Sequence, residues 1–297
     1  MRKIIAKLLY FLLYFKVRKE LCRNDSLLAI YGHDQKGKPL EDLLVWMLGK
    51  GYKFVTPSEV NSYVKEGINK YEGAKLAWLS FDDGWLSNYT EVLPVLIKHN
   101  VPATIFVATK GVEDGYYWTD KALQNRHSKL YKMVDELWEM PNVKRKEIIE
   151  KLPAYQGDRH TMNVVELKEM ADSGLITWGN HTYDHVMSDN CTTEELMDEI
   201  KKCSVQMEEF VGDNCNFIYS YPNGNYDLRS MKVIQHLGFQ MAVTTEIGRV
   251  FPYTDSFAIK RNEIKNVCLE ENILQALGLW TPFFNELKRM LGIKNKK

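Results

Sequence analysis

Short apolar segments alternate with amphipathic ones along most of this chain of 297 residues, and this alternation limits the fold more than any other feature. The apolar segments are rich in β-branched and aromatic residues, which favour strands, and segments of helical periodicity separate them. A strand, a helix and a second strand in this order place the two strands in parallel. The repeat therefore predicts an α/β barrel, closed or nearly closed. The predicted strands cover residues 27–31, 75–81, 103–108, 175–178, 217–221, 239–245 and 257–261.

Several predicted helices have recognisable ends. Thr192, followed three residues later by Glu195, is typical of a capping box that begins a helix. Glycines end the helices predicted over 40–50 and 164–173. A further helix is predicted over 88–99, with a kink expected at its proline.

The composition excludes some classes of protein. With 45% hydrophobic and 26% charged residues, the chain is typical of globular proteins. Its formal net charge is zero, so no overall basic field indicates a nucleic-acid partner. The five cysteines are odd in number and widely spaced, without a Cys-x-x-Cys pair. This pattern argues against a disulfide framework and favours a reducing compartment.

The strand–helix pattern divides the chain into parts. Residues 1–25 form an N-terminal amphipathic segment, residues 26–265 the main α/β domain, and residues 266–297 a helical, basic C-terminal tail. Residues 111–160 interrupt the pattern with charged and aromatic side chains. They are interpreted as a helical insertion after a strand's C-terminal end, which in a barrel is the face that carries active sites.

Residues 4–15 are apolar and aromatic, and basic residues lie on both sides of them. The run is too short to span a bilayer, which takes about 20 residues. Lys7 interrupts it, and no cleavage site typical of a signal peptide follows. Two interpretations stay open: a helix lying at a membrane surface, or a helix packed on the protein itself. The first interpretation would place the protein at the inner face of the membrane, and the second would place it in the cytoplasm.

Polar side chains follow two of the predicted strands. Asp82 and Asp83 come directly after the strand 75–81, and His181 and His185 follow another strand. One carboxylate and two imidazoles leave a coordination position open on a catalytic divalent metal. Side chains at a strand end point in different directions, so the second carboxylate is free to act as a base. A helix N-cap would account for one of the two aspartates but not for both. The pattern predicts a metal hydrolase.

The chain resembles the polysaccharide deacetylases with a NodB homology domain, carbohydrate esterase family 4. Residues 80–84 read Ser-Phe-Asp-Asp-Gly, similar to that family's Thr-Phe-Asp-Asp-Gly. Residues 181–185 read His-Thr-Tyr-Asp-His, similar to its His-Ser/Thr-x-x-His. Residues 101–107 and 217–224 are also similar to the family's sequences, and the resemblance covers about residues 27–262. The resemblance implies an irregular seven-stranded (β/α) barrel with the catalytic domain at residues 26–265.

The resemblance also implies roles for individual residues. Asp83, His181 and His185 would hold a divalent metal, zinc most often, with iron, cobalt and nickel as alternatives. Asp82 would be the base that takes a proton from a metal-bound water attacking the acetyl group. The backbone N–H of Asn223 would stabilise the oxyanion. The implied partner is an acetylated saccharide.

Two departures from the family pattern lead to further candidates. Ser220 stands where the third motif often has an arginine paired with the base. The late Leu-x-His motif, which supplies the general acid, is replaced by residues 259–261, Ile-Lys-Arg. One subgroup carries an early Tyr-His dipeptide, to which Tyr31-Gly32-His33 is similar. His33, otherwise as readily a structural histidine, is thus the candidate acid, and Arg261 the candidate partner of Asp82.

Together these interpretations predict a metal-dependent carbohydrate N-deacetylase, a hydrolase of C–N bonds other than peptide bonds. It would remove acetyl groups from an N-acetylated amino sugar in a polysaccharide or its precursor. Two alternatives stay open. The same site would also suit an O-acetyl ester or another small amide. A non-catalytic, metal-retaining carbohydrate-binding protein would explain the missing arginine and late histidine, although binding alone does not need Asp82.

Overall fold

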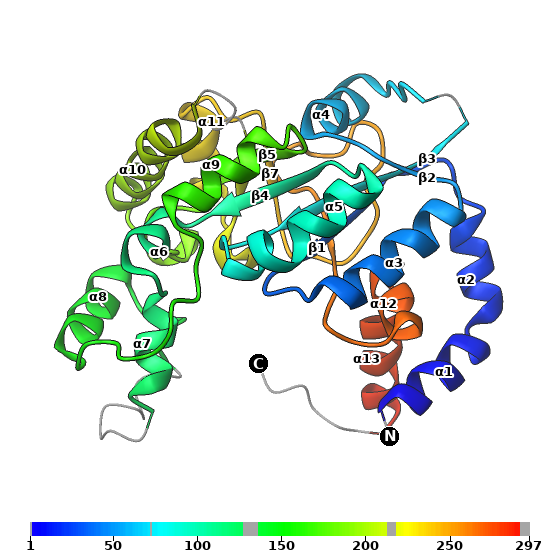
Figure 1. Cartoon of the computed structure of the whole chain (residues 1–297), viewed down its shortest axis with the longest axis horizontal. Coiled ribbons are helices and arrows are strands. Elements are labelled where there is room, and N and C mark those ends of the chain that lie inside the picture. The colour runs from blue at the N-terminus through cyan, green and yellow to red at the C-terminus, as the bar shows by residue number, and fades with distance from the viewer. Residues whose placement is uncertain (1, 72, 127–135, 213–217, 292–297) are drawn as a thin grey trace.

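The computed structural model describes residues 2–71, 73–126, 136–212 and 218–291, and its centre is a curled sheet of parallel strands (Figure 1). Seven strands follow one another in the order β7-β6-β5-β4-β3-β1-β8. The predicted α/β barrel, with seven strands in its main path, is confirmed. The strands are β1 (Leu28–Gly32), β3 (Lys75–Phe81), β4 (Ala103–Val107), β5 (Ile176–Asn180), β6 (Ile218–Ser220), β7 (Met241–Val243) and β8 (Asn262–Glu263).

Two features make the barrel irregular. A short strand that was not predicted, β2 (Tyr52–Phe54), pairs with the first half of β3, while β4 pairs with its second half. The far edge closes through a single parallel bridge from Val243 to Ile259, after which β8 pairs with β1. The predicted strand 257–261 is therefore wrong in position, because the chain crosses from β7 to β1 there and no continuous strand forms. Residue 217 of the predicted strand 217–221 lies outside the described residues.

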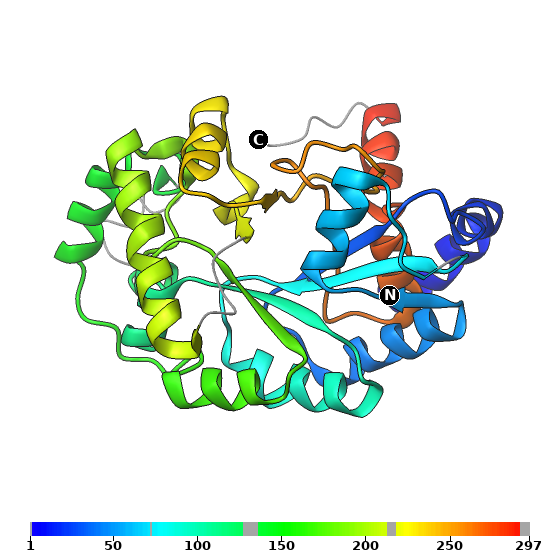
Figure 2. The ribbon, with the colours of Figure 1, turned by 90° about the horizontal axis from the view of Figure 1, so that it is seen from above.

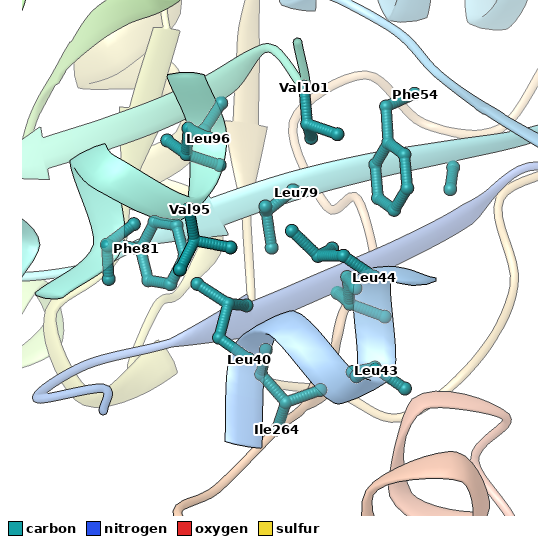
Figure 3. Close-up of a cluster of buried hydrophobic side chains, with 14 of the residues drawn as sticks. Leu40, Leu43, Leu44, Phe54, Leu79, Phe81, Val95, Leu96, Val101 and Ile264 are labelled. Carbon is teal, nitrogen blue, oxygen red and sulfur yellow. The ribbon is translucent and has the colours of Figure 1, made fainter. Parts of the chain in front are cut away.

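Alternate residues of β3 belong to two different apolar clusters. Leu76 and Trp78 join one cluster, and Ala77, Leu79 and Phe81 join the other. The second cluster fills the space between the sheet and the helices, as Figure 3 shows for Leu79 and Phe81 beside side chains of α3 and α5. This double burial explains why the strand is apolar almost throughout. The alternation places Ser80 and Asp82 on the face opposite α3 and α5.

Helices cover the outer side of the curled sheet, with α3, α5 and α9 along it in Figure 2. The residues Thr192 and Glu195 form the predicted capping box at the start of α10. The helix predicted over 88–99 is divided into a π-helix (Asn88–Val92) and α5, with Pro94 in the first turn of α5. The covering helices are α3 (Gly37–Gly49), α5 (Leu93–His99), α9 (Val164–Asp172), α10 (Thr193–Val211) and α11 (Leu228–His236). Helix α4 (Pro57–Glu66) lies on the opposite face of the sheet, where Val60 and Val64 share an apolar cluster with Leu76 and Trp78.

The remaining helices lie outside this repeat. Within or beside residues 111–160 are α6 (Thr109–Asp114), α7 (Trp118–Gln124) and α8 (Asn142–Lys151), with α7 and α8 at the lower left in Figure 1. The N-terminal helices α1 (Arg2–Leu12) and α2 (Tyr14–Leu21) lie at the opposite side, where α1 contacts α12 (Leu269–Ala276). The last described helix is α13 (Trp280–Met290). None of the helices in the described ranges has both the length and the apolar character needed to cross a bilayer.

Candidate metal centre and active site

Three side chains predicted to bind a metal come together beyond the C-terminal ends of β3 and β5. Asp83 follows β3 by two residues, His181 directly follows β5, and His185 lies four residues further on. Asp83 Oδ1 is 3.2 Å from the Nε2 atom of each histidine. Asp83 and His181 are buried, and His185 is only slightly exposed. The predicted ligand atoms thus form one compact group.

The residues of this group fit a divalent cation. Asp83 Oδ1 is buried and accepts no hydrogen bond, whereas Oδ2 accepts one from Trp85 Nε1 at 2.8 Å. A buried carboxylate oxygen without a partner is costly unless an ion or water satisfies it. Four ligands at about 2.1 Å from a tetrahedral zinc would lie roughly 3.4 Å apart. The observed separations of 3.2 Å are close to that spacing.

The neighbouring structure fixes the orientation of His181 and Asp83. His181 Nδ1 lies 2.8 Å from the carbonyl oxygen of Ser220, to which it donates in the neutral tautomer. That hydrogen bond leaves the lone pair of Nε2 free to face the group. Asp83 has a left-handed backbone, with φ of 77°, and the hydroxyl of Tyr117 donates to its carbonyl oxygen at 2.8 Å. Gly84 follows with φ of 96°, where an added Cβ would lie 3.2 Å from Val107.

Asp82, in contrast, is fully paired. Arg261 donates from Nη1 to Oδ1 at 2.8 Å and from Nη2 to Oδ2 at 2.7 Å. The same guanidinium donates to the hydroxyls of Ser80 and Ser220 at 3.1 and 3.0 Å, and its Nε donates to the carbonyl of Thr244. Arg261 is completely buried. Two parallel charge-assisted hydrogen bonds fix both the position and the direction of the carboxylate.

Both carboxyl groups are held in the ionised form. Burial alone would raise the pKa of Asp82, but Arg261, with His181 and His33, holds it below its usual value. Burial would also raise the pKa of Asp83, but His181 and His185 hold it well below the usual range. The site therefore presents two negative charges at neutral pH, of which one is neutralised by an arginine.

The other two predicted residues lie outside this group. His33 follows β1 by one residue, is 39% exposed, and has its Nδ1 4.0 Å from Glu263 Oε1. Asn223 follows β6 with φ of 56°, and its side chain donates to Asn225. Within the described part of the chain, no hydrogen bond or ion pair joins either side chain to Asp83, although the charge of His33 helps to lower the pKa of that carboxyl. Their proposed roles in acid catalysis and oxyanion binding remain predictions.

One contact that supports the segment from His181 to His185 was not predicted from the sequence. Arg145, from α8, is buried, stacks over the ring of Trp118 and donates to Asp184 Oδ2 at 3.1 Å. Lys110 lies 3.1 Å from the other oxygen of Asp184. Asp184 lies between His181 and His185, so Arg145 connects the predicted insertion to the segment that carries both histidines. The acidic residue inside the histidine motif was a signal for such a partner, but nothing in the sequence indicated Arg145.

The curled parallel barrel and the site at its strand ends together define a deacetylase of the NodB type. The sequence model of the polysaccharide deacetylase family matches residues 69–242, which is more than half of the chain, and the chain belongs to this family. It is 25% identical over 224 residues to YxkH of Bacillus subtilis, whose name assigns it to the polysaccharide deacetylases. That match covers 75% of this chain but only 63% of YxkH.

Two further proteins are similar over most of their length. The poly-β-1,6-N-acetyl-D-glucosamine N-deacetylase of Staphylococcus epidermidis is 23% identical over 290 residues, covering 92% of this chain and 83% of the relative. The deacetylase PplD of Streptococcus pyogenes, solved in complex with acetate, superposes with a TM-score of 0.62. That structure is 19% identical and covers 85% of this chain and 97% of its own, so the likeness shows a common fold.

Proposed function

We propose that this protein is a metal-dependent N-deacetylase that hydrolyses the acetamido group of an N-acetylated amino sugar in a polysaccharide or its precursor. The observation that carries the proposal is the contrast between two adjacent carboxylates. Asp82 is locked by Arg261, whereas Asp83 turns an unpartnered oxygen toward two imidazoles. Membership of the polysaccharide deacetylase family gives the general reaction. The staphylococcal relative, named for an N-acetylglucosamine polymer, supports an amino sugar as substrate.

Asp83, His181 and His185 would hold the divalent cation. One carboxylate and two imidazoles suit zinc best, and iron, cobalt and nickel are the alternatives. A cation bound there would supply Lewis-acid activation of water and of the acetyl carbonyl. The carbonyl of Ser220 would keep His181 in the tautomer that binds metal, through the contact to Nδ1.

The chain's own side chains would move the protons. Asp82, held ionised and aimed by Arg261, would take the proton of the attacking water as the new C–O bond forms. His33 would give a proton to the sugar nitrogen as the C–N bond breaks, leaving acetate and a free amine. The amide N–H of Asn223 would stabilise the oxyanion that precedes this cleavage.

Two alternative functions share the same residues. An O-acetyl ester or another small amide would need the same cation and base, but an alcohol leaves more readily than an amine and depends less on His33. A non-catalytic sugar-binding protein was suggested by the lack of an arginine at position 220 and of the late histidine. Arg261, which directly precedes β8, pairs with Asp82 in place of an arginine at position 220, so the serine at 220 does not favour loss of catalysis.

Acetate release tests the proposal directly. The full-length protein, loaded with zinc, would be incubated with N-acetylated glucosamine oligomers, with O-acetylated saccharides and with either substrate plus a chelator. We expect acetate from the N-acetylated oligomers, loss of this activity with chelator, and its return with added zinc. Release from O-acetyl groups alone would contradict the N-deacetylase proposal. Absence of release by metal-loaded protein across the panel would favour the non-catalytic alternative.

A further inference from the structure

The N-terminal helices α1 and α2 are fixed to the body of the protein by one face. Ala6, Leu9, Leu13 and Val17 recur at steps of three and four and are all buried. Three of them belong to the apolar cluster that also contains side chains of α3. Arg2 donates to the buried carboxylate of Glu271 on α12, with its Nη2 at 2.6 Å from Oε1. This segment is therefore a packed part of the structure.

The opposite face of the same helices is also apolar but is exposed. Its large side chains recur at helical spacing and are between 59% and 82% exposed. We call them the N-terminal ridge: Ile4, Leu8, Phe11, Leu12 and Phe15. Five such side chains on one helical face are unusual for a surface that meets only water. The two interpretations of the N-terminal segment left open by the sequence are thus compatible, since each concerns a different face.

The positive charge beside the N-terminal ridge favours an anionic partner. Residues 2–19 contain six basic residues and no acidic one, although the whole chain has no net charge. Arg2 is paired with Glu271, and Lys7, within the ridge, lies 3.8 Å from Glu270. The basic side chains at both ends of the ridge are exposed, namely Lys3, Lys16, Arg18 and Lys19. Apolar side chains flanked by Lys and Arg are typical of helices that lie in the interface of an anionic membrane.

We propose that the N-terminal ridge docks the protein on the surface of an anionic lipid bilayer, with α1 lying in the plane of the membrane. The ridge would enter the boundary between headgroups and acyl chains, and the flanking basic residues would contact lipid phosphates. The buried face would stay on the protein body, so docking needs no unfolding. This arrangement would bring the barrel to substrates that are assembled at, or linked to, a membrane.

Cosedimentation with lipid vesicles tests the ridge. Full-length protein at low salt would be mixed with vesicles of equimolar phosphatidylglycerol and phosphatidylcholine, and with vesicles of phosphatidylcholine alone. We expect binding to the anionic vesicles that weakens with salt, because the lipid attraction is screened. The triple variant Leu8→Gln, Phe11→Gln, Phe15→Gln should bind at least about tenfold more weakly, since buried apolar side chains supply much of the affinity.

Control variants keep the result specific. Val165→Gln with Leu228→Gln removes apolar side chains that are equally exposed on α9 and α11, and it should bind vesicles like the unmodified protein. Lack of vesicle binding by the full-length protein, or unchanged binding by the triple variant, would overturn the proposal. A solution dimer that the triple variant converts to monomers, without vesicle binding, would assign the ridge to a second copy of the chain instead. Acetate release from soluble oligomers should be the same in all variants, so this test is independent of the proposed function.

Discussion

Asp82 and Asp83 are neighbours in the sequence, yet the protein surrounds their carboxylates in opposite ways. Both oxygens of Asp82 accept hydrogen bonds from Arg261, which is itself held by two serine hydroxyls. Asp83 has one oxygen paired with Trp85 and one that accepts no hydrogen bond beside two imidazoles. The first environment fixes a charge, and the second keeps lone pairs available for a cation.

The backbone produces this difference. Asp82 continues the alternation of β3 and lies on the same face as Ser80, and Arg261 donates hydrogen bonds to both side chains. Asp83 then adopts a left-handed backbone conformation. For a residue with a side chain, this conformation typically costs on the order of 1–3 kcal/mol of folding free energy. Its carbonyl is held by Tyr117 and by the amide of Ala108. The strain therefore serves to aim two adjacent carboxylates at different partners.

The largest effect is expected from removing a ligand on the Asp83 side. His181→Ala should lose bound metal and abolish acetate release, because two remaining ligands hold a divalent cation weakly. Metal content by mass spectrometry and acetate release would be measured on the same preparation. His236→Ala, an exposed histidine at the end of α11, is the matched control and should behave as the unmodified protein. Full metal and full turnover in His181→Ala would show that the ligands are assigned wrongly.

The partner of Asp82 is expected to have the next largest effect. Arg261→Gln leaves a buried carboxylate unpaired, which typically costs about 3–5 kcal/mol of stability. Because burial then dominates, the pKa of Asp82 should rise, and the acid limb of the pH–rate profile should move to higher pH. Turnover near neutral pH should fall by roughly 100-fold as the base is misaligned. Arg261→Lys keeps the charge but not the two parallel donors, so its turnover and its acid limb should lie between those of Arg261→Gln and of the unmodified protein. An acid limb that does not shift in Arg261→Gln would contradict this account.

These two sides of the site were not equally predictable from the sequence. Asp83, His181 and His185 were predicted to lie together because each follows an apolar strand, and parallel strands bring their C-terminal ends to one edge; the structure places them together. Arg261 was placed at the end of a predicted strand, 257–261, whereas the observed strand β8 covers residues 262–263. Its contact with Asp82 was therefore proposed from the family pattern alone. The acidic residue in the histidine motif indicated a basic partner, but Arg145 could not be identified as that partner, since the contact depends on how an insertion folds back over the barrel.

A smaller and more selective effect is expected at His33. His33→Ala should lower turnover of an N-acetylated sugar by about 100-fold, the low end of general acid catalysis. An aryl acetate needs no proton on its leaving group and should lose less than about tenfold. Metal content should not change, because His33 does not belong to the cluster of Asp83. Equal losses on both substrates would make His33 a structural residue.

The smallest effect on turnover is expected where the insertion meets the segment from His181 to His185. Arg145→Gln should weaken zinc binding by about 10- to 100-fold, as for other residues that orient ligands, with little change in turnover at saturating metal. Lys110→Gln should do less, because that lysine is partly exposed and its ion pair is screened. Competition with a chromophoric chelator measures both affinities. Zinc affinities equal to that of the unmodified protein in both variants would remove Asp184 from the support of the site.

The central claim is that two adjacent carboxylates divide the work, one holding the cation and the other taking the proton. The most direct measurement compares Asp82→Asn and Asp83→Asn for bound metal and for acetate release in the same preparations. Asp82→Asn should keep the full metal content, while its rate of acetate release should fall by about 10²- to 10⁴-fold, because an amide cannot accept the proton. Asp83→Asn should lose the metal and the activity together. If both variants lose metal equally, or if Asp82→Asn keeps its full rate, the division of roles is wrong.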